Sequence, residues 1–415
     1  MPSASARSLR KALVADLERR GAIRSPAVRR AFSTVARERF VPEVAEREGL
    51  ERVYSDDALV TRTNTRGAPI SSSSQPTIMA EMLENLDVAS GLRVLEIGTG
   101  TGYNAALLAT LVGRRGHVTS IELEPDLAAK ADAALAGGGY RVEVITGDAA
   151  AGLGQDHPRY DRVVLTAAYD HVPRAWRDLL VEGGLIELPL RLPGPADGEQ
   201  AVVTLRREGD DLRSVAIVPG AFMNLRRPGV EEGAPPLLSS LSVSELVNGR
   251  GRSIASVSGG GLARMPATAR RRLAAVMLTR PRVGRMATPG PANSSVVAYV
   301  GMATAAGGVT VRTVRPRTRG HFRLGAGVAA RDGTGLALLI GRGEGRGCRV
   351  EVYGDGPGAA AAEAALREVV ARWRAAGCPS LSDCEVTMTY GRPPPGPPAW
   401  VSEHGGVFTA LRWPA

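Results

Sequence analysis

Apolar residues in the first half of the chain follow two alternating periods. Short runs rich in Val, Ile and Leu predict buried strands, and the stretches between them, with apolar residues three and four positions apart, predict helices. Strands that alternate with helices in this way predict an α/β fold with a parallel sheet covered on both faces. The predicted strands are residues 93–97, 117–122, 141–145, 161–166 and 184–188, and the helices between them are residues 103–111, 125–135 and 173–181.

The same patterning extends to both sides of this region. Further helices are predicted at residues 5–20, 26–38 and 76–86, the last beginning with Pro76 at a favourable first-turn position. Residues 201–207 and 212–218 read as two more strands, and the EGDD sequence between them indicates a hairpin. The predicted sheet therefore has seven strands and ends with an antiparallel strand.

The pattern changes after residue 226. Residues 226–240 are rich in Pro, Gly and charge, which is typical of a linker. We therefore predict two domains, residues 1–232 and residues 233–415, the second of α+β class. Its predicted elements are helices at residues 267–278 and 358–375 and strands near residues 295–301, 308–313, 335–340 and 348–353.

Charge divides the chain at the same place. Residues 1–232 hold 29 Lys and Arg against 32 Asp and Glu, whereas residues 233–415 hold 23 against 10, so the net charge of +10 comes entirely from the second half. This asymmetry predicts an acidic partner for the second domain. No run approaches the roughly 18 apolar residues of a membrane span, and the N-terminus has no apolar signal core, so we expect a cytoplasmic protein.

Cysteine usage agrees with that compartment. The three cysteines, Cys348, Cys378 and Cys384, form no CxxC pair and leave an odd count. This pattern fits a reducing environment and indicates neither a disulfide framework nor a zinc site, so we expect no metal.

A glycine-rich turn follows the first strand of the sheet, in LEIGTGTGYNAALLA. Gly98, Gly100 and Gly102 let a nucleotide-like ligand approach the backbone and the N-terminus of the next helix. The dinucleotide fingerprint needs a further glycine where this chain has Tyr103. The spacing and the preceding carboxylate of Glu96 therefore favour S-adenosylmethionine over NAD, because a sulfonium ligand has no pyrophosphate and its cationic methionine end suits a nearby acid.

Two more acidic residues close the next strands. Glu122 ends the second strand and is placed to accept hydrogen bonds from ribose hydroxyls, although NAD sites use an acid there too. Asp148 follows the third strand and is predicted to face the adenine edge. Carboxylates at successive strand ends, together with the glycine turn, predict a cofactor site, whose remaining contacts are Thr99, Tyr103, Leu123 and Gly147.

From about residue 7 to 222 the chain resembles the protein-L-isoaspartate O-methyltransferases. The resemblance rests on segments in matching order: RERFVPE (37–43), VYSDDAL (53–59), SQP (74–76), VLEIGTGTGYNAALLA (94–109), TAAYDHVP (166–173), GGLIELPL (183–190) and AIVP (216–219). It implies a Rossmann-like class I methyltransferase sheet with the cofactor across its switch point. It also implies that a substrate carboxylate is received near the SQP segment.

Four serines precede the helix at Pro76, and they give this acceptor site its chemistry. A carboxylate has a pKa of about 4 and is already ionised at neutral pH, so its methylation needs orientation and no general base. We predict that the hydroxyls of Ser72, Ser73 and Ser74, with the unpaired backbone N–H groups at the helix start, form a neutral cradle. Ser74 matches the serine of the family motif and is the first candidate, with Gln75 beside it.

Two other groups of residues are predicted to contact substrate. Ala168 and His171, in the TAAYDHVP segment, would form a wall where substrate passes, and His171 has no need to act as a base. In the second domain, Arg270, Arg271 and Arg317 stand for a set of arginines that would bind acidic peptide, since guanidinium groups bind carboxylates bidentately. The alternative is a solvated face on a domain that only stabilises or dimerises the enzyme.

Several functions remain open at this point, including a cofactor site that serves only as a binding scaffold. The extension beyond residue 230 resembles that of methyltransferases of ribosomally made modified peptides such as lanthipeptides and graspetides. We therefore favour methylation of an aspartate in a precursor peptide, giving an ester that cyclises to an aspartimide and hydrolyses to isoaspartate. The alternative is repair of isoaspartyl proteins. A nucleic-acid methyltransferase is a further alternative, disfavoured by 4% aromatic residues and an acidic first half.

Overall fold

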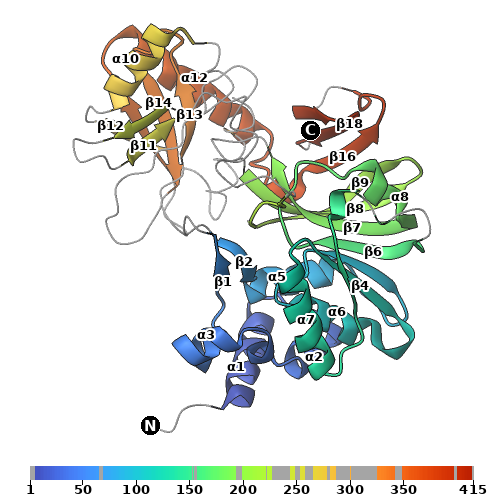
Figure 1. Ribbon diagram of the computed structural model, residues 1–415. Helices are drawn as coiled ribbons and strands as arrows, with labels where there is room; N and C mark the ends of the chain where they lie inside the picture. Colours follow the sequence, from blue (N-terminus) through green and yellow to red (C-terminus); the bar gives the residue numbers. More distant parts are fainter. Residues whose placement is uncertain are drawn as a thin grey trace.

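The described residues form a ten-stranded sheet, a four-stranded sheet, two separate two-stranded hairpins and the helices that pack on them (Figure 1). The computed structural model describes residues 5–64, 69–151, 153, 157–192, 199–220, 222–226, 244–247, 253–257, 265–277, 281–286, 300, 325–341, 348–396 and 400–413. Within these residues, no helix is both long enough and apolar enough to cross a lipid bilayer.

The large sheet has ten strands in the order β17-β18-β16-β9-β8-β7-β6-β3-β4-β5. Its strands are β3 (Arg93–Ile97), β4 (His117–Glu122), β5 (Glu143–Thr146), β6 (Tyr160–Leu165), β7 (Leu180–Leu192), β8 (Glu199–Glu208), β9 (Asp211–Pro219), β16 (Glu385–Tyr390), β17 (Trp400–His404) and β18 (Val407–Arg412). Strands β3 to β7 are parallel to one another, and every later pair is antiparallel.

This arrangement confirms the predicted α/β class and its parallel core. The chain order reverses at β3, because β4 lies on one side of it and β6 on the other. Such a switch point opens a crevice at the carboxyl ends of the strands. One detail differs from the prediction: the antiparallel strand β8 is the sixth of the seven strands and not the last, since β9 pairs with β8 and runs in the direction of β7.

Helices bury the two faces of the sheet in separate cores. They are α1 (Ala6–Arg19), α2 (Pro26–Thr34), α3 (Pro42–Glu48), α4 (Leu50–Val53), α5 (Pro76–Asn85), α6 (Tyr103–Val112), α7 (Pro125–Gly137) and α8 (Arg174–Asp178). Side chains of α1, α2, α5 and α6 pack with Val94 and Val164 on one face. On the opposite face, Trp176 of α8 packs with Leu95 and Val163. The predicted helix at residues 173–181 is shorter than expected because β7 begins at Leu180.

The C-terminal strands return to the large sheet, which corrects the predicted division at residue 232. Strand β16 pairs with β9 through Thr387 and Met388, and β18 and β17 follow it outward. Val386 and Met388 are fully buried in the same core as Leu95. Residues 385–412 therefore complete the first sheet, because their apolar face is buried on it, and the remainder of the second half is inserted between β9 and β16.

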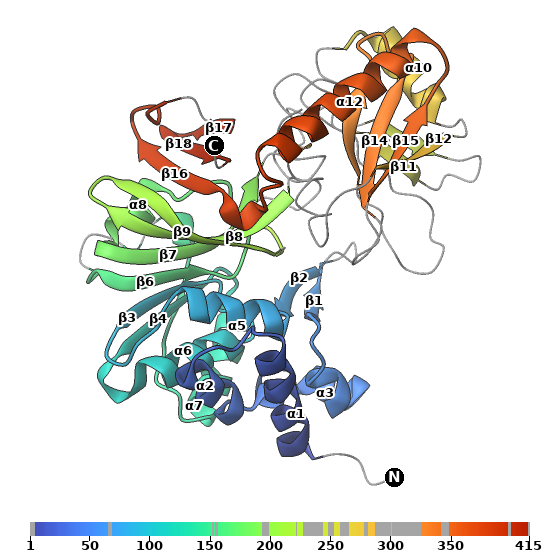
Figure 2. The ribbon, with the colours of Figure 1, turned by 180° about the vertical axis from the view of Figure 1, so that it is seen from behind.

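The inserted part contains a four-stranded antiparallel sheet in the order β12-β15-β14-β13. Its elements are β12 (Arg282–Met286), β13 (Gly325–Ala329), β14 (Leu336–Gly341), β15 (Cys348–Tyr353), α10 (Ala267–Met277) and α12 (Pro357–Ala375), with a separate hairpin of β10 (Ser244–Val247) and β11 (Ser253–Val257). Helix α12 buries Leu366 and Trp373 on one face of the sheet, and α10 buries Leu273 on the other. Figure 2 shows α12 leading from this sheet towards β16.

Four of the elements predicted for the second half are confirmed: α10, α12, β14 and β15. The predicted strands at residues 295–301 and 308–313 lie outside the described residues, apart from Val300. The sequence pattern missed β13, whose GAGVA sequence lacks the bulky β-branched residues of a typical strand.

Candidate active site

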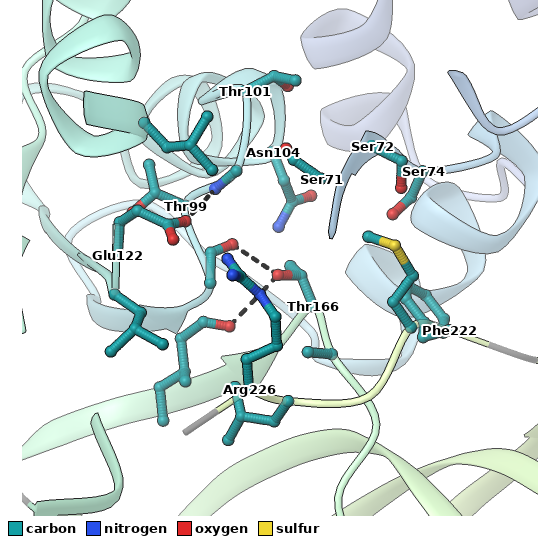
Figure 3. A pocket seen from close by; sticks show the side chains of 18 of the residues that line it. Ser71, Ser72, Ser74, Thr99, Thr101, Asn104, Glu122, Thr166, Phe222 and Arg226 are labelled. Carbon is teal, nitrogen blue, oxygen red and sulfur yellow. Dashed lines mark hydrogen bonds between the residues drawn. The ribbon is translucent and has the colours of Figure 1, made fainter. Parts of the chain in front are cut away.

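A cavity of about 440 Å³ opens at the carboxyl ends of β3, β4 and β6, at the switch point of the large sheet (Figure 3). Most of the residues predicted from the sequence line it. They are Ser72, Ser73, Ser74, Gln75, Gly98, Thr99, Gly100, Tyr103, Glu122, Leu123, Gly147 and Asp148. The predicted cofactor contacts and the serines, which lie on different elements, are thus brought together around one space.

The glycine turn after β3 has the backbone that was predicted to admit a ligand. Gly98, Gly100 and Gly102 have φ values of +96°, +54° and +85°, a region that side chains with a Cβ rarely adopt. A Cβ on Gly98 would lie 2.5 Å from Oγ1 of Thr166, which donates a hydrogen bond to the Gly98 carbonyl over 2.5 Å. Gly102 does not line the cavity and instead lets α6 begin close to Ala131 of α7.

Glu122 is held at the cavity wall by the backbone. Its carboxylate accepts hydrogen bonds from the N–H of Gly100 over 2.8 Å and from the N–H of Glu124 over 3.2 Å. Asp148 also accepts a backbone bond, from Ala150 over 2.9 Å. Both acids are therefore preorganised acceptors, which is what ribose hydroxyls and an adenine amino group require.

Glu96 differs from its predicted role, because its side chain does not line the cavity. It is fully buried behind the glycine turn, where it accepts hydrogen bonds from Ser120 over 2.5 Å and from Asn104 over 2.8 Å. Burial raises the pKa of Glu96 to about 7, partly offset by these two bonds, and Glu122 adds to the rise. Glu96 therefore orients Asn104, which does line the cavity, and is not a direct contact for a cationic ligand.

Ser71, Ser72 and Ser73 belong to a strand, and Ser74 follows it directly, before α5. Strand β2 (Pro69–Ser73) pairs with β1 (Leu59–Thr63) in an antiparallel hairpin at the cavity mouth. Ser73 is buried, and its hydroxyl accepts a hydrogen bond from Nε of Arg37 over 3.3 Å. Ser72 and Ser74 are partly exposed and lie side by side on one wall in Figure 3. Of the three predicted serines, these two are available to a ligand.

The start of α5 is not the open anion site that the sequence suggested. Asp56 accepts a hydrogen bond from the N–H of Thr77 over 2.8 Å and from its hydroxyl over 2.7 Å. The same carboxylate accepts a bond from Gln75 and forms an ion pair with Arg20 at 3.0 Å. A carboxylate from the chain itself therefore caps this helix, and the Thr77 N–H is not free for a substrate.

Sequence reasoning missed one wall of the cavity. Phe222 to Arg226 line it, and they follow β9 as a strap tied to the segment after β6. The N–H of Ala168 donates to the Met223 carbonyl over 2.7 Å, and the N–H of Leu225 donates to the Ala168 carbonyl over 2.9 Å. At the end of the strap, Arg226 forms an ion pair with Glu124 at 2.7 Å. No sequence signal marks the strap, because its place depends on backbone bonds to a distant segment.

Other cavity residues were missed too, among them the polar residues Thr101, Asn104 and Thr166. Asn104 is the first polar side chain of α6, immediately after the glycine turn, and that position was the available signal. Thr166 follows β6 directly, as Gly98 follows the adjacent strand β3.

Several predicted substrate contacts lie elsewhere. Ala168 is fully buried and is not part of the cavity lining, because its backbone holds the strap. His171 also lies outside the lining and stacks on His404 of β17, with ring centroids 5.4 Å apart. Arg270 and Arg271 belong to α10 of the small sheet, and Arg317 lies outside the described residues.

Comparison with known proteins supports the interpretation of this geometry. The model of the protein-L-isoaspartate(D-aspartate) O-methyltransferase family matches residues 7–223. The chain belongs to this family. It is 38% identical over 217 residues to the protein-L-isoaspartate O-methyltransferase of Methanothermobacter thermautotrophicus, an alignment that spans 51% of this chain and 94% of that protein. With the enzyme of that name from Rhodopseudomonas palustris it shares 38% over 209 residues, 50% of this chain and 88% of the relative.

The likeness of fold extends beyond the family domain. A solved structure titled protein-L-isoaspartate O-methyltransferase superposes with a TM-score of 0.51 at 23% identity, covering 97% of this chain and 99% of that one. The chain is thus an S-adenosylmethionine-dependent O-methyltransferase of this family. Its glycine turn and fixed acids fit this cofactor.

Proposed function

We propose that this protein methylates the free carboxylate of isoaspartyl residues in proteins and peptides. An isoaspartyl linkage carries the backbone through the side-chain carboxyl group, so the main-chain carboxylate stands free as a short anionic branch. The observation that carries the proposal is the pair of partly exposed serines, Ser72 and Ser74, which share one cavity with the glycine turn and Glu122.

The chain supplies orientation, and the cofactor supplies an activated methyl group on a sulfonium sulfur. An ionised carboxylate is already a nucleophile, so no base is needed. The hydroxyl groups of Ser72 and Ser74 are neutral donors that position one oxygen without withdrawing its charge. The strap from Phe222 to Arg226 also lines the cavity, and we infer that it reduces the access of water.

Support for isoaspartyl repair is stronger than support for precursor-peptide maturation. The family match and the relatives described above bear the isoaspartyl name. The inserted sheet does not distinguish the two functions. The superposition with the solved structure titled protein-L-isoaspartate O-methyltransferase covers 97% of this chain and 99% of that one, so it extends over the inserted part as well. No observation favours a nucleic-acid substrate. The peptide-maturation interpretation stays a prediction.

A peptide series tests the proposal. Three peptides of one sequence carry isoaspartate, aspartate or asparagine at a single position, and each is incubated with the purified protein and methyl-labelled cofactor. We expect base-labile methyl ester on the isoaspartyl peptide, with kcat/KM about 100-fold above that of the aspartyl peptide. The carboxylate of the aspartyl peptide is displaced, so its oxygen is not aligned with the methyl group of the cofactor. Equal labelling of the aspartyl peptide, or base-stable label on added RNA, contradicts the proposal.

The inserted part is proposed to recruit acidic segments of the substrate. Arg271 and Arg272 are exposed on α10, in the half of the chain that carries the excess positive charge. Changing both to Glu is expected to raise KM several-fold, by about 1 kcal/mol at low salt, for a peptide with flanking acidic residues. The KM of a neutral-flanked peptide serves as the control, and an equal rise for both peptides contradicts this role.

A further inference from the structure

Arg37 is a fully buried cation directly behind the serine strand. It lies in the 3-10 helix η1 (Arg37–Phe40). The Cζ atom of its guanidinium lies 5.8 Å from the ring centroid of Tyr103, a residue that lines the cavity. Within the described part of the chain its hydrogen bonds go to the Ser73 hydroxyl and to the carbonyl groups of Val53, Ser55, Asp57, Ser73 and Ser74. The shortest, to the Ser74 carbonyl, measures 2.9 Å.

These bonds satisfy the N–H groups of Arg37 without neutralising its charge. Carbonyl and hydroxyl oxygens are dipoles, whereas a buried cation is ordinarily paired with a carboxylate. Asp56, the acid whose charge acts on Arg37, is engaged by Arg20, Thr77 and Gln75. Burial lowers the pKa of Arg37, while Tyr103 and Asp56 oppose the change. A guanidinium group nevertheless stays protonated in proteins, so one positive charge remains behind the acceptor wall.

We propose that Arg37 makes the acceptor site selective for an anionic substrate group, acting through Ser73 and Ser74 without touching the substrate. This inference rests on the proposed function. The guanidinium donates to the Ser73 hydroxyl and the Ser74 carbonyl, and not to the Ser72 and Ser74 hydroxyls proposed to meet the carboxylate. Its charge therefore attracts the anion without a hydrogen bond to it. A direct bond from an arginine would hold the attacking oxygen and reduce its nucleophilicity.

The charge changes of the reaction determine which kinetic constant Arg37 controls. An oxygen–carbon bond forms, the carbon–sulfur bond breaks, and its electron pair stays on sulfur, so a carboxylate and a sulfonium become an ester and a thioether. Negative charge on the substrate therefore falls in the transition state. A nearby cation stabilises the bound carboxylate more than the transition state, so it lowers KM without raising kcat.

Coulomb's law sets the size of the effect. For charges about 8 Å apart at an effective dielectric constant of about 20, the attraction corresponds to about a 30-fold change in affinity. Replacement by Arg37→Gln is thus expected to raise the KM of the isoaspartyl peptide by about 30-fold, with kcat unchanged or higher. The Ki of the same peptide with a neutral carboxamide in place of the carboxylate, and the Kd of S-adenosylmethionine, should stay as in the wild type.

Two further variants separate charge from shape. Arg37→Lys keeps the charge but loses most of the hydrogen bonds, and we expect its KM to return to near the wild-type value. Arg39→Gln is the matched control, because Arg39 is in the same segment but exposed, donating to the Gly137 carbonyl over 3.0 Å. A Lys variant as impaired as Gln, or parallel losses for the charged and the neutral peptide, overturns the proposal.

A measurement on the wild-type enzyme needs no stable variant. The ratio between carboxamide Ki and carboxylate KM should be about 30 and should persist at 0.5 M salt, since a buried charge is little screened. A ratio near one, or one that disappears in salt, overturns the role of Arg37. If the wild type fails to methylate the isoaspartyl peptide at all, the proposed function fails instead, so the two failures are distinguishable.

Discussion

The cavity has two walls that are built in different ways. The cofactor wall consists of the ends of β3, β4 and β5, with the glycine turn, Glu122 and Asp148. The acceptor wall consists of a two-stranded hairpin whose serines rest on Arg37. In the first wall each predicted ligand-facing group lies at the end of its own strand or in the turn after it, and Glu122 is also fixed by the turn of the neighbouring strand. In the second, the groups are placed by contacts with residues distant in the sequence.

This difference separates the part of the site expected to recognise the cofactor from the part expected to recognise the protein substrate. Backbone N–H groups bind Glu122 and Asp148 and leave little freedom, as recognition of an invariant cofactor requires. In the proposed function the serine segment meets a variable protein substrate, and its position depends on one buried cation and one capped helix. Substitutions in the two walls should therefore affect different measured constants.

The largest expected effect is on the free energy of unfolding, and it comes from Glu96, which is buried behind the cofactor wall. Burial raises the pKa of Glu96 to about 7 from an ordinary 4.5, so the folded protein holds a proton that the unfolded chain releases between these values. Stability from this group is thus present below pH 4.5 and lost as the pH rises to about 7. The variant Glu96→Gln cannot ionise and has no such loss. The difference in unfolding free energy between the variant and the wild type should therefore change in favour of the variant by about 3 kcal/mol from pH 4.5 to pH 8.

Urea unfolding of both proteins at pH 5 and pH 8 measures this difference. Other titrating groups, including the buried Glu187, whose pKa burial raises well above its usual value, are common to both proteins and cancel. A difference that does not change with pH would show that Glu96 is ionised in the folded protein.

The next largest effect is on turnover, at the acceptor wall. Ser74→Ala should lower kcat about 100-fold, the size seen when one positioned donor is removed, with the Kd of S-adenosylmethionine unchanged. Ser71→Ala is the control, since Ser71 also lines the cavity, from β2, but its hydroxyl is engaged by a bond from Thr61 over 3.1 Å. Similar activity of the two variants would exclude Ser74 from the reaction.

A third effect is on cofactor affinity. Glu122→Gln keeps an oxygen for the Gly100 N–H but removes the negative charge offered to the cofactor. We expect the Kd of S-adenosylmethionine to rise about 20-fold, the difference between charged and neutral hydrogen bonds, with little change in peptide KM. Calorimetry measures it, with the half-exposed Glu143→Gln on β5 as the control. A change in peptide KM alone would contradict the separation of the two walls.

The smallest effect belongs to the strap that joins the walls. The ion pair between Arg226 and Glu124 is partly exposed, with 19% and 30% of the side chains accessible, so its contribution is modest. Arg226→Ala should accelerate cofactor dissociation about threefold at low salt and less at high salt. Stopped-flow release rates test this, with Arg62→Ala, which removes the more exposed ion pair to Asp126, for comparison. Equal rates in all three proteins would show that the strap does not retain the cofactor.

The sequence predicted the cofactor wall better than the acceptor wall, for a physical reason. Gly98 and Gly100 need positive φ in a turn between a strand and a helix, and this requirement is local. Glu96 was misplaced because a carboxylate next to the turn can point to either side of the sheet, and its bonds to Ser120 and Asn104 decide which. The sequence shows that the four serines are polar. It does not show that the hydroxyls of Ser71 and Ser73 already accept hydrogen bonds from Thr61 and Arg37.

What the sequence by itself determined is the order of strands and helices from α5 to β9 and the glycine turn, since these follow from periodicity and local backbone chemistry, and the family, since its motif segments occur in matching order. Tertiary structure alone decided that β16 joins β9, that Ala168 anchors the strap and that Asp56 caps α5. It also decided that Arg37 lies under the serines. Each of these depends on groups far apart along the chain whose hydrogen bonds must be satisfied when they are buried, and no local pattern records which partner satisfies them.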